Sequence, residues 1–445
     1  MFPIQEFLKH ALKFSSLKCF YYTLQPTRHP IERVFWIAWC FLMFLAAAWL
    51  SLCNWDRYQK NPTVISLERN YLDWNTTLSA LTLCPRPGLD QAAVLRVARS
   101  VYPKDVEKGV EFLNALANWT YPNLGQIPND HEFEPSLYQQ MLMYLRVNFS
   151  HNLPNLPSSQ KLSLSMTEVG ICYSLNSQLA FYADPRYWMS NNWNLRKPVI
   201  LIHGNPLDVA EMSVQVNDIK VSFNAYLHDG EETIDGSSNL MFPVGFQEAM
   251  YLDICALSTY STEATRTLSV QQRKCRFIEE SNLEISPVYS YRLCQSECRM
   301  HLSLKLCGCI PYFYRNTGKY KVCGPSGMNC LDKYKERLLK LRDGNKREVC
   351  DCIQNCNFVN VWTTRILQGA WDRDTIVRLS LDSYPRYRLK RDIFYSFGDL
   401  LAQMGGTTGL CFGCSVLSIF ELFYIITMRL FFFIKNKEYM KPIYS

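Results

Sequence analysis

The sequence lacks the short motifs by which most enzymes are recognised. It has no Gly-rich phosphate-binding loop, and His203-Gly204 and the scattered serines form no nucleophile motif. Internal repeats and low-complexity linkers are also absent. We therefore expect a protein that is not an enzyme and that carries no cofactor and no metal of its own.

Charge is absent from a long apolar stretch, Val34–Cys53, which has 20 residues and would measure about 30 Å as an α-helix, enough to cross a bilayer. A second apolar segment runs from about Gly409 to Ile434 and contains one acid, Glu421, and one late base, Arg429. We predict an integral membrane protein with two transmembrane helices. The first helix is 34–53, and the segment 396–434 contains a pre-pore segment and the second helix. A large domain, 54–395, lies between them.

An apolar h-region is missing from the first 33 residues, so we expect no signal peptide and a first span that acts as its own signal anchor. The formal net charge is +7, and the two ends of the chain, 1–33 and 429–445, together carry nine bases against three acids. Basic tails stay in the cytosol. We predict that the tails 1–33 and 435–445 are cytosolic and that the middle domain is extracellular, and the basic balance then requires no nucleic acid.

Cysteine is concentrated in the middle domain. Thirteen of the 18 cysteines lie between Cys84 and Cys356, and ten of these lie from Cys275 onward. In an extracellular domain this density indicates a disulfide framework. A zinc site is the alternative, built on Cys307-Gly-Cys309 and Cys350-Asp-Cys352, although both pairs lack the usual spacing and nearby histidines.

The middle domain reads as α+β. Three glycosylation sequons, at Asn75, Asn118 and Asn148, fall within it and agree with an extracellular position. Alternating apolar patterns predict strands at 63–68, 78–83, 358–363 and 375–381 and several strands between 198 and 260. Amphipathic patterns predict helices at 91–101, 138–147, 289–306 and 331–349; the basic face of the last is interpreted as a solvated surface.

Small residues gather in the second apolar segment. Gly405, Gly409 and Gly413 recur every four residues, with Gly406 beside them, and on a helix they would form a smooth stripe that lets neighbouring helices approach. Gly413-Cys414-Ser415 follows at membrane depth, where small residues permit a narrow constriction lined by carbonyls and a hydroxyl that replace an ion's water shell.

Two polar residues follow this constriction. Ser418 lies three residues beyond Ser415. Glu421 is the only acid in either span, and an ionisable group in a membrane indicates function by default. It either attracts cations at the inner mouth of a pore or is a paired structural group, and the sequence favours neither. A chain with two spans must oligomerise to conduct.

Several ordered blocks resemble the degenerin/epithelial sodium channel family, most of all its insect pickpocket group. The blocks are Ser396–Tyr424, Gly170–Ser177, Tyr289–Tyr314 and Cys350–Cys356, and the resemblance covers nearly the whole chain. It implies a trimeric, sodium-selective, voltage-independent cation channel that is sensitive to amiloride. Its extracellular domain would have palm, β-ball, knuckle, finger (about 89–165) and thumb (about 275–356) parts.

The resemblance also assigns the pore residues. Gly413, Cys414 and Ser415 fall on the selectivity filter, and Gly405 and Gly406 match paired glycines just before the pore. Ala402 falls on the degenerin position, where a bulky side chain holds such channels open.

The resemblance implies six disulfides and leaves Cys255 unpaired. Nested bridges would fix the helices at 289–306 and 331–349 side by side as a stiff thumb. The implied pairs are Cys84–Cys172, Cys275–Cys356, Cys294–Cys352, Cys298–Cys350, Cys307–Cys330 and Cys309–Cys323.

Two positions depart from the family pattern. Lys18-Cys19 stands where the family has a His-Gly pair that affects gating, and Cys414 replaces a more usual alanine, glycine or serine. Both departures favour a subunit of a heteromer.

The resulting hypothesis is a pore-forming subunit of a sodium channel in the plasma membrane, opened by an extracellular stimulus, in a sensory cell or epithelium. Its partners would be the bilayer and related subunits in a homo- or heterotrimer, with Na⁺ as the permeant ion. A non-conducting two-pass receptor or regulatory subunit is the alternative, but it leaves the glycines, the filter tripeptide and Glu421 without a role. An ATP-gated two-span channel is a further alternative, and the basic stretch 334–347 is the single feature that supports it. The sequence does not reveal the stimulus, the partner subunits or the tissue.

Overall fold

The computed structural model divides the chain into two compact units. One consists of 1–64, 264–273 and 392–445, and the other of 65–263 and 274–391. We call them the helical unit and the sheet unit. The structure describes residues 29–125, 127–129, 132–154, 161–190, 202–204, 206, 212–316, 318–344, 346–347, 350–413, 415–424, 427–428 and 431.

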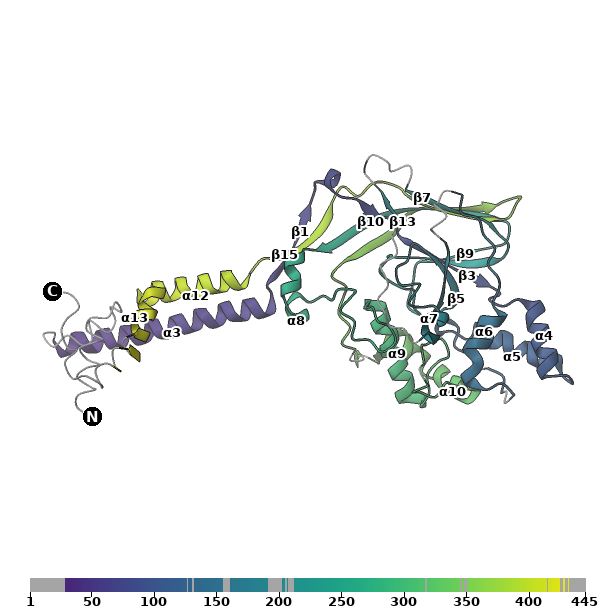
Figure 1. Ribbon diagram of the computed structural model, residues 1–445, viewed down its shortest axis with the longest axis horizontal. Coiled ribbons are helices and arrows are strands. Elements are labelled where there is room, and N and C mark those ends of the chain that lie inside the picture. Colours follow the sequence, from purple (N-terminus) through teal and green to yellow (C-terminus); the bar gives the residue numbers. More distant parts are fainter. Residues whose placement is uncertain are drawn as a thin grey trace. The chain divides into compact units, whose positions relative to one another are not determined.

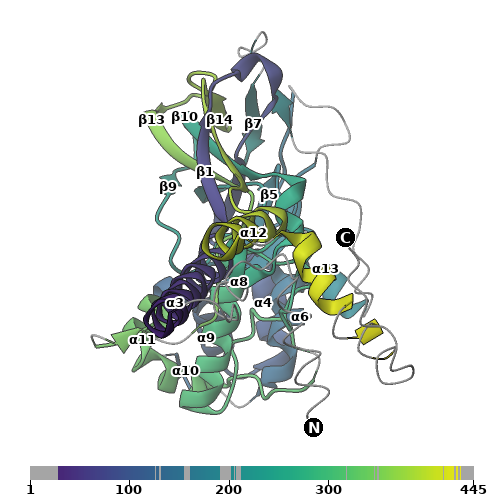
Figure 2. The ribbon, with the colours of Figure 1, turned by 90° about the vertical axis from the view of Figure 1, so that its left-hand side faces the viewer.

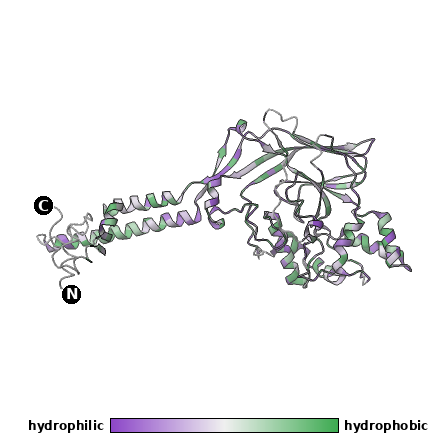
Figure 3. Cartoon of the chain, in the orientation of Figure 1, coloured by the Kyte–Doolittle hydropathy of each residue, from purple (hydrophilic) through white to green (hydrophobic). Residues whose placement is uncertain are grey.

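The helical unit is built on one long helix, α3 (Pro30–Lys60). Among the described residues it is the one helix long and apolar enough to span a membrane, and it contains the whole of the predicted first span. Figure 3 shows hydrophobic residues over most of its length. The other helices of this unit are α8 (Val270–Arg273), α12 (Phe397–Phe412) and α13 (Val416–Tyr424).

Two β-sheets form the frame of the sheet unit (Figure 1). The larger has the order β1-β15-β10-β14-β7, with β13 on the other side of β10, and the smaller has the order β4-β5-β3-β8-β9. The strands of the larger sheet are β1 (Thr63–Glu68), β7 (Ser213–Ile219), β10 (Glu248–Ser261), β13 (Phe358–Ala370), β14 (Thr375–Leu381) and β15 (Arg388–Ile393). Those of the smaller are β3 (Ala80–Arg86), β4 (Ser163–Thr167), β5 (Gly170–Leu175), β8 (Ser222–His228) and β9 (Met241–Val244). Two-residue strands pair as β2 (Thr76–Thr77) with β6 (His203–Gly204) and as β11 (Arg342–Asp343) with β12 (Lys346–Arg347).

Strand β10 is the centre of the larger sheet. It pairs antiparallel with β13 along one side and parallel with β14 and β15 along the other. Every second residue of β14 is buried, as expected when one face of a strand covers a core. The core joins the two sheets: Leu252 of β10 and Leu379 of β14 belong to the same apolar cluster as Leu83 of β3 and Phe223 of β8.

Helices form a second core in the same unit. The predicted helix at 91–101 is present as α4 (Gln91–Val101), and that at 138–147 as α6 (Tyr138–Leu145). Between them lies α5 (Val106–Asn118), which the sequence analysis missed because Asn and Pro surround it. Asp105 marks its start, because the Asp105 side chain accepts the N–H of Lys108. Short elements complete the unit: α7 (Pro185–Met189), η1 (Tyr71–Asp73), η2 (Tyr121–Asn123), η3 (Pro135–Leu137) and, across the boundary with the helical unit, η5 (Glu263–Thr267).

The predicted helix at 289–306 is α9 (Tyr291–Cys307), but a single helix at 331–349 is wrong. That stretch contains the end of α10 (Pro325–Asp332), then α11 (Lys335–Lys340) and the β11–β12 hairpin. Helix α11 ends where Leu341 adopts a left-handed conformation (φ 48°), which reverses the chain into the hairpin.

Within the described part of the chain there are six disulfides, and they join the same cysteines as the six pairs that the resemblance implies. Their arrangement differs from two helices fixed side by side. Cys294 and Cys298 on one face of α9 are bound to Cys352 and Cys350, which lie in a segment without regular structure. Only Cys307–Cys330 joins α9 to α10. Two of the three disulfides of α9 therefore connect it to the irregular segment that precedes β13.

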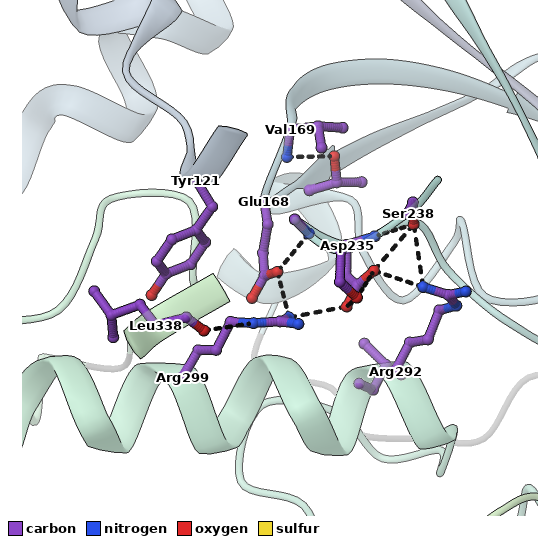
Figure 4. Close-up of polar contacts among 12 residues, drawn as sticks. Tyr121, Glu168, Val169, Asp235, Ser238, Arg292, Arg299 and Leu338 are labelled. Atoms are coloured by element: carbon purple, nitrogen blue, oxygen red, sulfur yellow. Dashed lines mark hydrogen bonds and ion pairs between the residues drawn. The ribbon is translucent and has the colours of Figure 1, made fainter. Parts of the chain in front are cut away.

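A buried ion-pair network, centred on Arg299 of α9, connects three parts of the sheet unit (Figure 4). Nη1 of Arg299 lies 2.7 Å from Oε2 of Glu168, in the β4–β5 turn, and 2.9 Å from Oδ2 of Asp235, in the β8–β9 connection. Nε of Arg299 donates to the carbonyl of Leu338 in α11. Both carboxylates and the guanidinium are at most 4% exposed.

The network is charge-balanced by a second arginine. Nη1 of Arg292 lies 2.7 Å from Oδ1 of Asp235, and the Tyr314 hydroxyl donates to Oε1 of Glu168. Burial alone would raise the pKa of Asp235, but the attraction of Arg299 and Arg292 outweighs it and holds that pKa below its ordinary value. Two carboxylates and two guanidinium groups thus lie together, and each has a partner of opposite sign.

We predict that Arg299→Met strongly destabilises the sheet unit. The substitution leaves Glu168 and Asp235 buried without their shared cation, and breaking a buried pair in this way costs about 3–5 kcal/mol. Lys340→Met is the control, since it removes an exposed ion pair with Glu336, worth roughly 0.5 kcal/mol or less. The measurement is the Tm of each purified full-length variant in detergent. Equal Tm values for the two variants would contradict the assigned role of Arg299.

Candidate functional site

The base of α12 is attached to the end of α3 by backbone and aromatic contacts within the helical unit. The carbonyl of Pro62 accepts the N–H groups of both Phe394 and Tyr395. The Arg57 guanidinium lies 5.2 Å from the ring centre of Phe394 and 5.6 Å from that of Tyr395, in cation–π geometry. Tyr58 packs against Tyr395, with ring centres 6.4 Å apart. These contacts fix the start of α12, where the chain enters the second apolar segment.

Helix α12 begins at a capping box. Ser396 accepts the N–H of Asp399, and the Asp399 carboxylate accepts the N–H of Ser396, so two otherwise unpaired donors are satisfied. The sequence Ser396-Phe-Gly-Asp399 contained this start signal, but the sequence analysis did not use it. Ala402 lies in the second turn of the helix and is exposed.

Helix α12 ends at Gly413, which is where the predicted glycine stripe stops being helical. Gly405, Gly406 and Gly409 lie within α12, but Gly413 is the C-cap, with φ 66° and ψ 20°. Its N–H donates to the carbonyl of Gly409 over 2.8 Å. A residue without a Cβ adopts this left-handed conformation at little cost, so glycine ends the helix here. Expecting Gly413 on the same helical stripe was therefore wrong.

A new helix, α13, starts at Val416, immediately after Ser415 (Figure 2). Ser415 and Ser418 cap it reciprocally: the N–H of each donates to the hydroxyl oxygen of the other over 3.3 Å. The Ser418 side chain is buried, and Glu421 lies one turn further along, half-buried. Gly413, the C-cap of α12, and Ser415, just before α13, thus both lie outside the two helices. Cys414 itself lies outside the described residues.

The paired glycines of α12 face open space within the described part of this chain. A Cβ built on Gly405 or Gly406 would meet no described atom within 4 Å. Leu410 and Leu417 nearby are 85% and 77% exposed. An apolar, glycine-bearing surface of this kind is suited to contact with lipid or with another helix.

The remaining predicted residues are placed as follows. Asn75, Asn118 and Asn148 are all exposed, as an acceptor for a glycan must be. Cys255 is free and half-buried on β10, and its thiol lies 3.7 Å from the hydroxyl of Ser383. Lys18-Cys19 lies outside the described residues. The Arg299 network was missed, because its members are far apart in the sequence and form no motif.

Comparison with known proteins identifies relatives of the chain. A family model described as amiloride-sensitive sodium channel matches residues 12–425. The chain is 27% identical over 222 residues to Pickpocket protein 11 of Drosophila melanogaster, covering 46% of this chain and 42% of that protein. It is 20% identical over 487 residues to Sodium channel protein Nach of Drosophila melanogaster, covering 94% of this chain and 86% of that protein.

The coverage of the relatives is uneven. Sodium channel protein Nach of Drosophila virilis is 27% identical over 203 residues, and the alignment covers 42% of this chain and 52% of that protein. The chain thus aligns with about half the length of some relatives. A solved structure, described as a proton-activated chloride channel, aligns over 89% of this chain at 7% identity and a TM-score of 0.24, a level at which two folds need not be the same.

The family match accounts for the sequence blocks, the disulfides and the long apolar helix together. It confirms the predicted relationship to degenerin and pickpocket proteins, and it confirms that the chain is not an enzyme, because the family consists of ion channels. The chain belongs to the amiloride-sensitive sodium channel family.

Proposed function

We propose that this chain is a pore-forming subunit of a voltage-independent, sodium-selective, amiloride-sensitive cation channel in the plasma membrane. In this proposal it crosses the membrane twice, at α3 and through α12–α13, with both termini in the cytosol. It assembles with two further subunits, of its own kind or related, and opens in response to an extracellular stimulus in a sensory cell.

The observation that carries the proposal is that the second apolar segment is not one helix: α12 ends at the C-cap Gly413, and α13 begins at Val416. Backbone groups outside a helix are tolerated at membrane depth only where protein covers them or where they line a water-filled cavity. The end of α12 leaves carbonyl groups without intrahelical donors, and they point past the C-terminal end of the helix. Three copies around an axis would form a ring of carbonyls, which is how ion filters replace the water shell of a cation.

The surface of α12 supports assembly with other subunits. Gly405 and Gly406 are open, and the exposed leucines at 410 and 417 add apolar area. Close approach of neighbouring helices at glycines is the usual way in which membrane helices pack. Glu421, one turn beyond the Ser418 cap, would then lie on the cytosolic side of the filter, where a carboxylate raises the local concentration of cations.

Sodium selectivity and amiloride sensitivity rest on the family description and on the correspondence of Gly413, Cys414 and Ser415 with the family's filter. The name of the Nach relatives, sodium channel protein, supports the same ion. The alternative of a non-conducting receptor or regulatory subunit shares the topology and the disulfides, and electrical measurement separates the two.

We predict that Ala402→Phe produces a constitutive sodium current. Ala402 is exposed on α12, so a bulky side chain here must displace a neighbouring helix if the subunits pack along this surface. The measurement is the current in oocytes that express the variant, with and without amiloride. Ala402→Ser is the matched control and should behave like the unmodified chain, because serine is small.

The outcome is interpretable only with the protein confirmed at the cell surface. Silence of Ala402→Phe alone indicates an obligate heteromer and requires co-expression with related subunits. Silence with every related subunit would contradict the channel function and favour the non-conducting receptor.

We predict further that extracellular Cd²⁺ blocks this current through Cys414. Three thiols at the filter would form a soft-ligand ring of the kind that binds Cd²⁺. Cys414→Ser should weaken the block by about tenfold or more, on the order of the loss seen when metal sites lose a contributing group, while current persists. Cys411→Ser is the control, since Cys411 lies in α12 before the break. Equal block of both variants would place the Cd²⁺ site elsewhere.

A further inference from the structure

A polar cavity of about 460 Å³ lies within the sheet unit. Its walls come from the end of β8 and the β8–β9 connection, the first turns of α9 and the start of β13. This volume is within the range of pockets that hold small organic ligands. None of its lining residues belongs to the predicted pore, and neither the fold nor the proposed channel function requires the cavity.

The acidic groups of the cavity exceed its basic groups. Asp229 and Glu232 line it together with Arg292. Arg292, however, is already bound to Asp235 at 2.7 Å, and Arg299 is shared by Asp235 and Glu168 (Figure 4). The two arginines of α9 are therefore balanced by Glu168 and Asp235, and the carboxylates of Asp229 and Glu232 come in addition.

Both extra carboxylates are buried and held in fixed positions. Asp229, 9% exposed, accepts the N–H of Val359 at the start of β13 over 2.7 Å. Glu232, 7% exposed, accepts the Ser290 hydroxyl over 2.7 Å and the N–H of Arg292 at the beginning of α9. Burial raises the pKa of Asp229 to about 6 and that of Glu232 to about 7. The protein thus keeps two acids where their charge is costly, as is common at functional sites.

The rest of the wall offers apolar and aromatic surface. Leu227 and Leu240 lie on one side of the cavity, and Phe358 and Val361 on the β13 side, with Tyr291 at the α9 side. Aromatic rings attract cations over their faces. A ligand with a cationic head and an apolar body would find a partner for each part.

We propose that this cavity binds a small organic amine, with its ammonium group between Asp229 and Glu232 and its hydrocarbon body against Phe358 and the neighbouring apolar residues. The ammonium group supplies the missing positive charge and donates to both carboxylates. A carboxylate that is desolvated without a cation gains more from such a ligand than an exposed one does.

Protons compete with this ligand. The charged groups around the two carboxylates are Arg292 and Asp235, the neighbouring Glu231 and, through Glu231, Glu279. His228 is buried, which lowers its pKa to about 4 and leaves it neutral. Burial, together with repulsion from Asp229, raises the pKa of Glu231 to about 8. Because the pKa values of Asp229 and Glu232 are raised, both carboxylates are protonated as the pH falls through those values, and amine binding is lost on the acidic side.

The test is calorimetric titration of the purified full-length chain in detergent with 2-phenylethylamine. The alcohol 2-phenylethanol has the same body without the positive charge and is the matched ligand control. We expect saturable binding of the amine, binding of the alcohol weaker by on the order of tenfold to a hundredfold, and loss of amine binding at a pH below the pKa of Glu232. Because binding is measured without current, the result does not depend on whether the chain conducts.

Glu232→Gln and Asp229→Asn should each weaken amine binding by on the order of tenfold while keeping the hydrogen-bond acceptors. Glu336→Gln is the control variant, because its side chain is 86% exposed on α11, outside the cavity. No binding to the unmodified chain, equal binding of amine and alcohol, or equal loss in Glu336→Gln would each overturn the proposal. If either cavity variant fails to fold, the alcohol comparison and the pH dependence in the unmodified chain still decide it.

Discussion

The sheet unit depends on one buried guanidinium. Arg299 brings a full positive charge into the interior, and it is tolerated there only because Glu168 and Asp235 lie within 3 Å of it. Those acids belong to the β4–β5 turn and the β8–β9 connection, so the requirement for charge balance fixes α9 against both ends of the smaller sheet. The disulfides of Cys294 and Cys298 bind the same helix covalently to the segment that precedes β13. The position of α9 is thus specified twice, by charge and by covalent bonds.

This balance explains the acidic cavity beside it. Arg292 is drawn toward Asp235 as part of the same network, which leaves Asp229 and Glu232 in excess at the start of α9. Glu232 also contributes to the N-terminal cap of α9 through Ser290 and the N–H of Arg292, so its negative charge is stabilised by the helix end as well. A structural network and a candidate ligand site therefore share one helix terminus.

In the helical unit the unpaired backbone groups at helix ends are satisfied locally. A capping box does this at the start of α12, and the Ser415–Ser418 pair does it at the start of α13. Among the described residues between these helices, Gly413 and Ser415 lie outside a helix. Small residues such as these fit a place where backbone must approach an ion or another subunit closely.

Local signals predicted the elements well and their interruptions poorly. The strand at 375–381 and the helix at 91–101 were found at their full extent, because apolar periodicity continues from end to end. The helix that contains the predicted first span is longer than the apolar stretch, because α3 continues through polar residues to Lys60. Leu341 and Gly413 each end a helix by adopting a left-handed conformation. Composition does not predict this conformation for a leucine. In a glycine-rich helix, composition does not show which glycine adopts it. The disulfide pairs followed from family resemblance, whereas the Arg299 network depends on tertiary contacts between residues up to 146 positions apart.

The central claim is that this chain forms a cation pore that selects sodium. Its most direct test is the reversal potential of the current carried by surface-expressed channels when extracellular sodium is replaced by a large organic cation. If the account is right, the reversal potential moves to more negative voltages as sodium is removed and follows the sodium gradient. A reversal potential that ignores sodium, or that follows chloride, would contradict it.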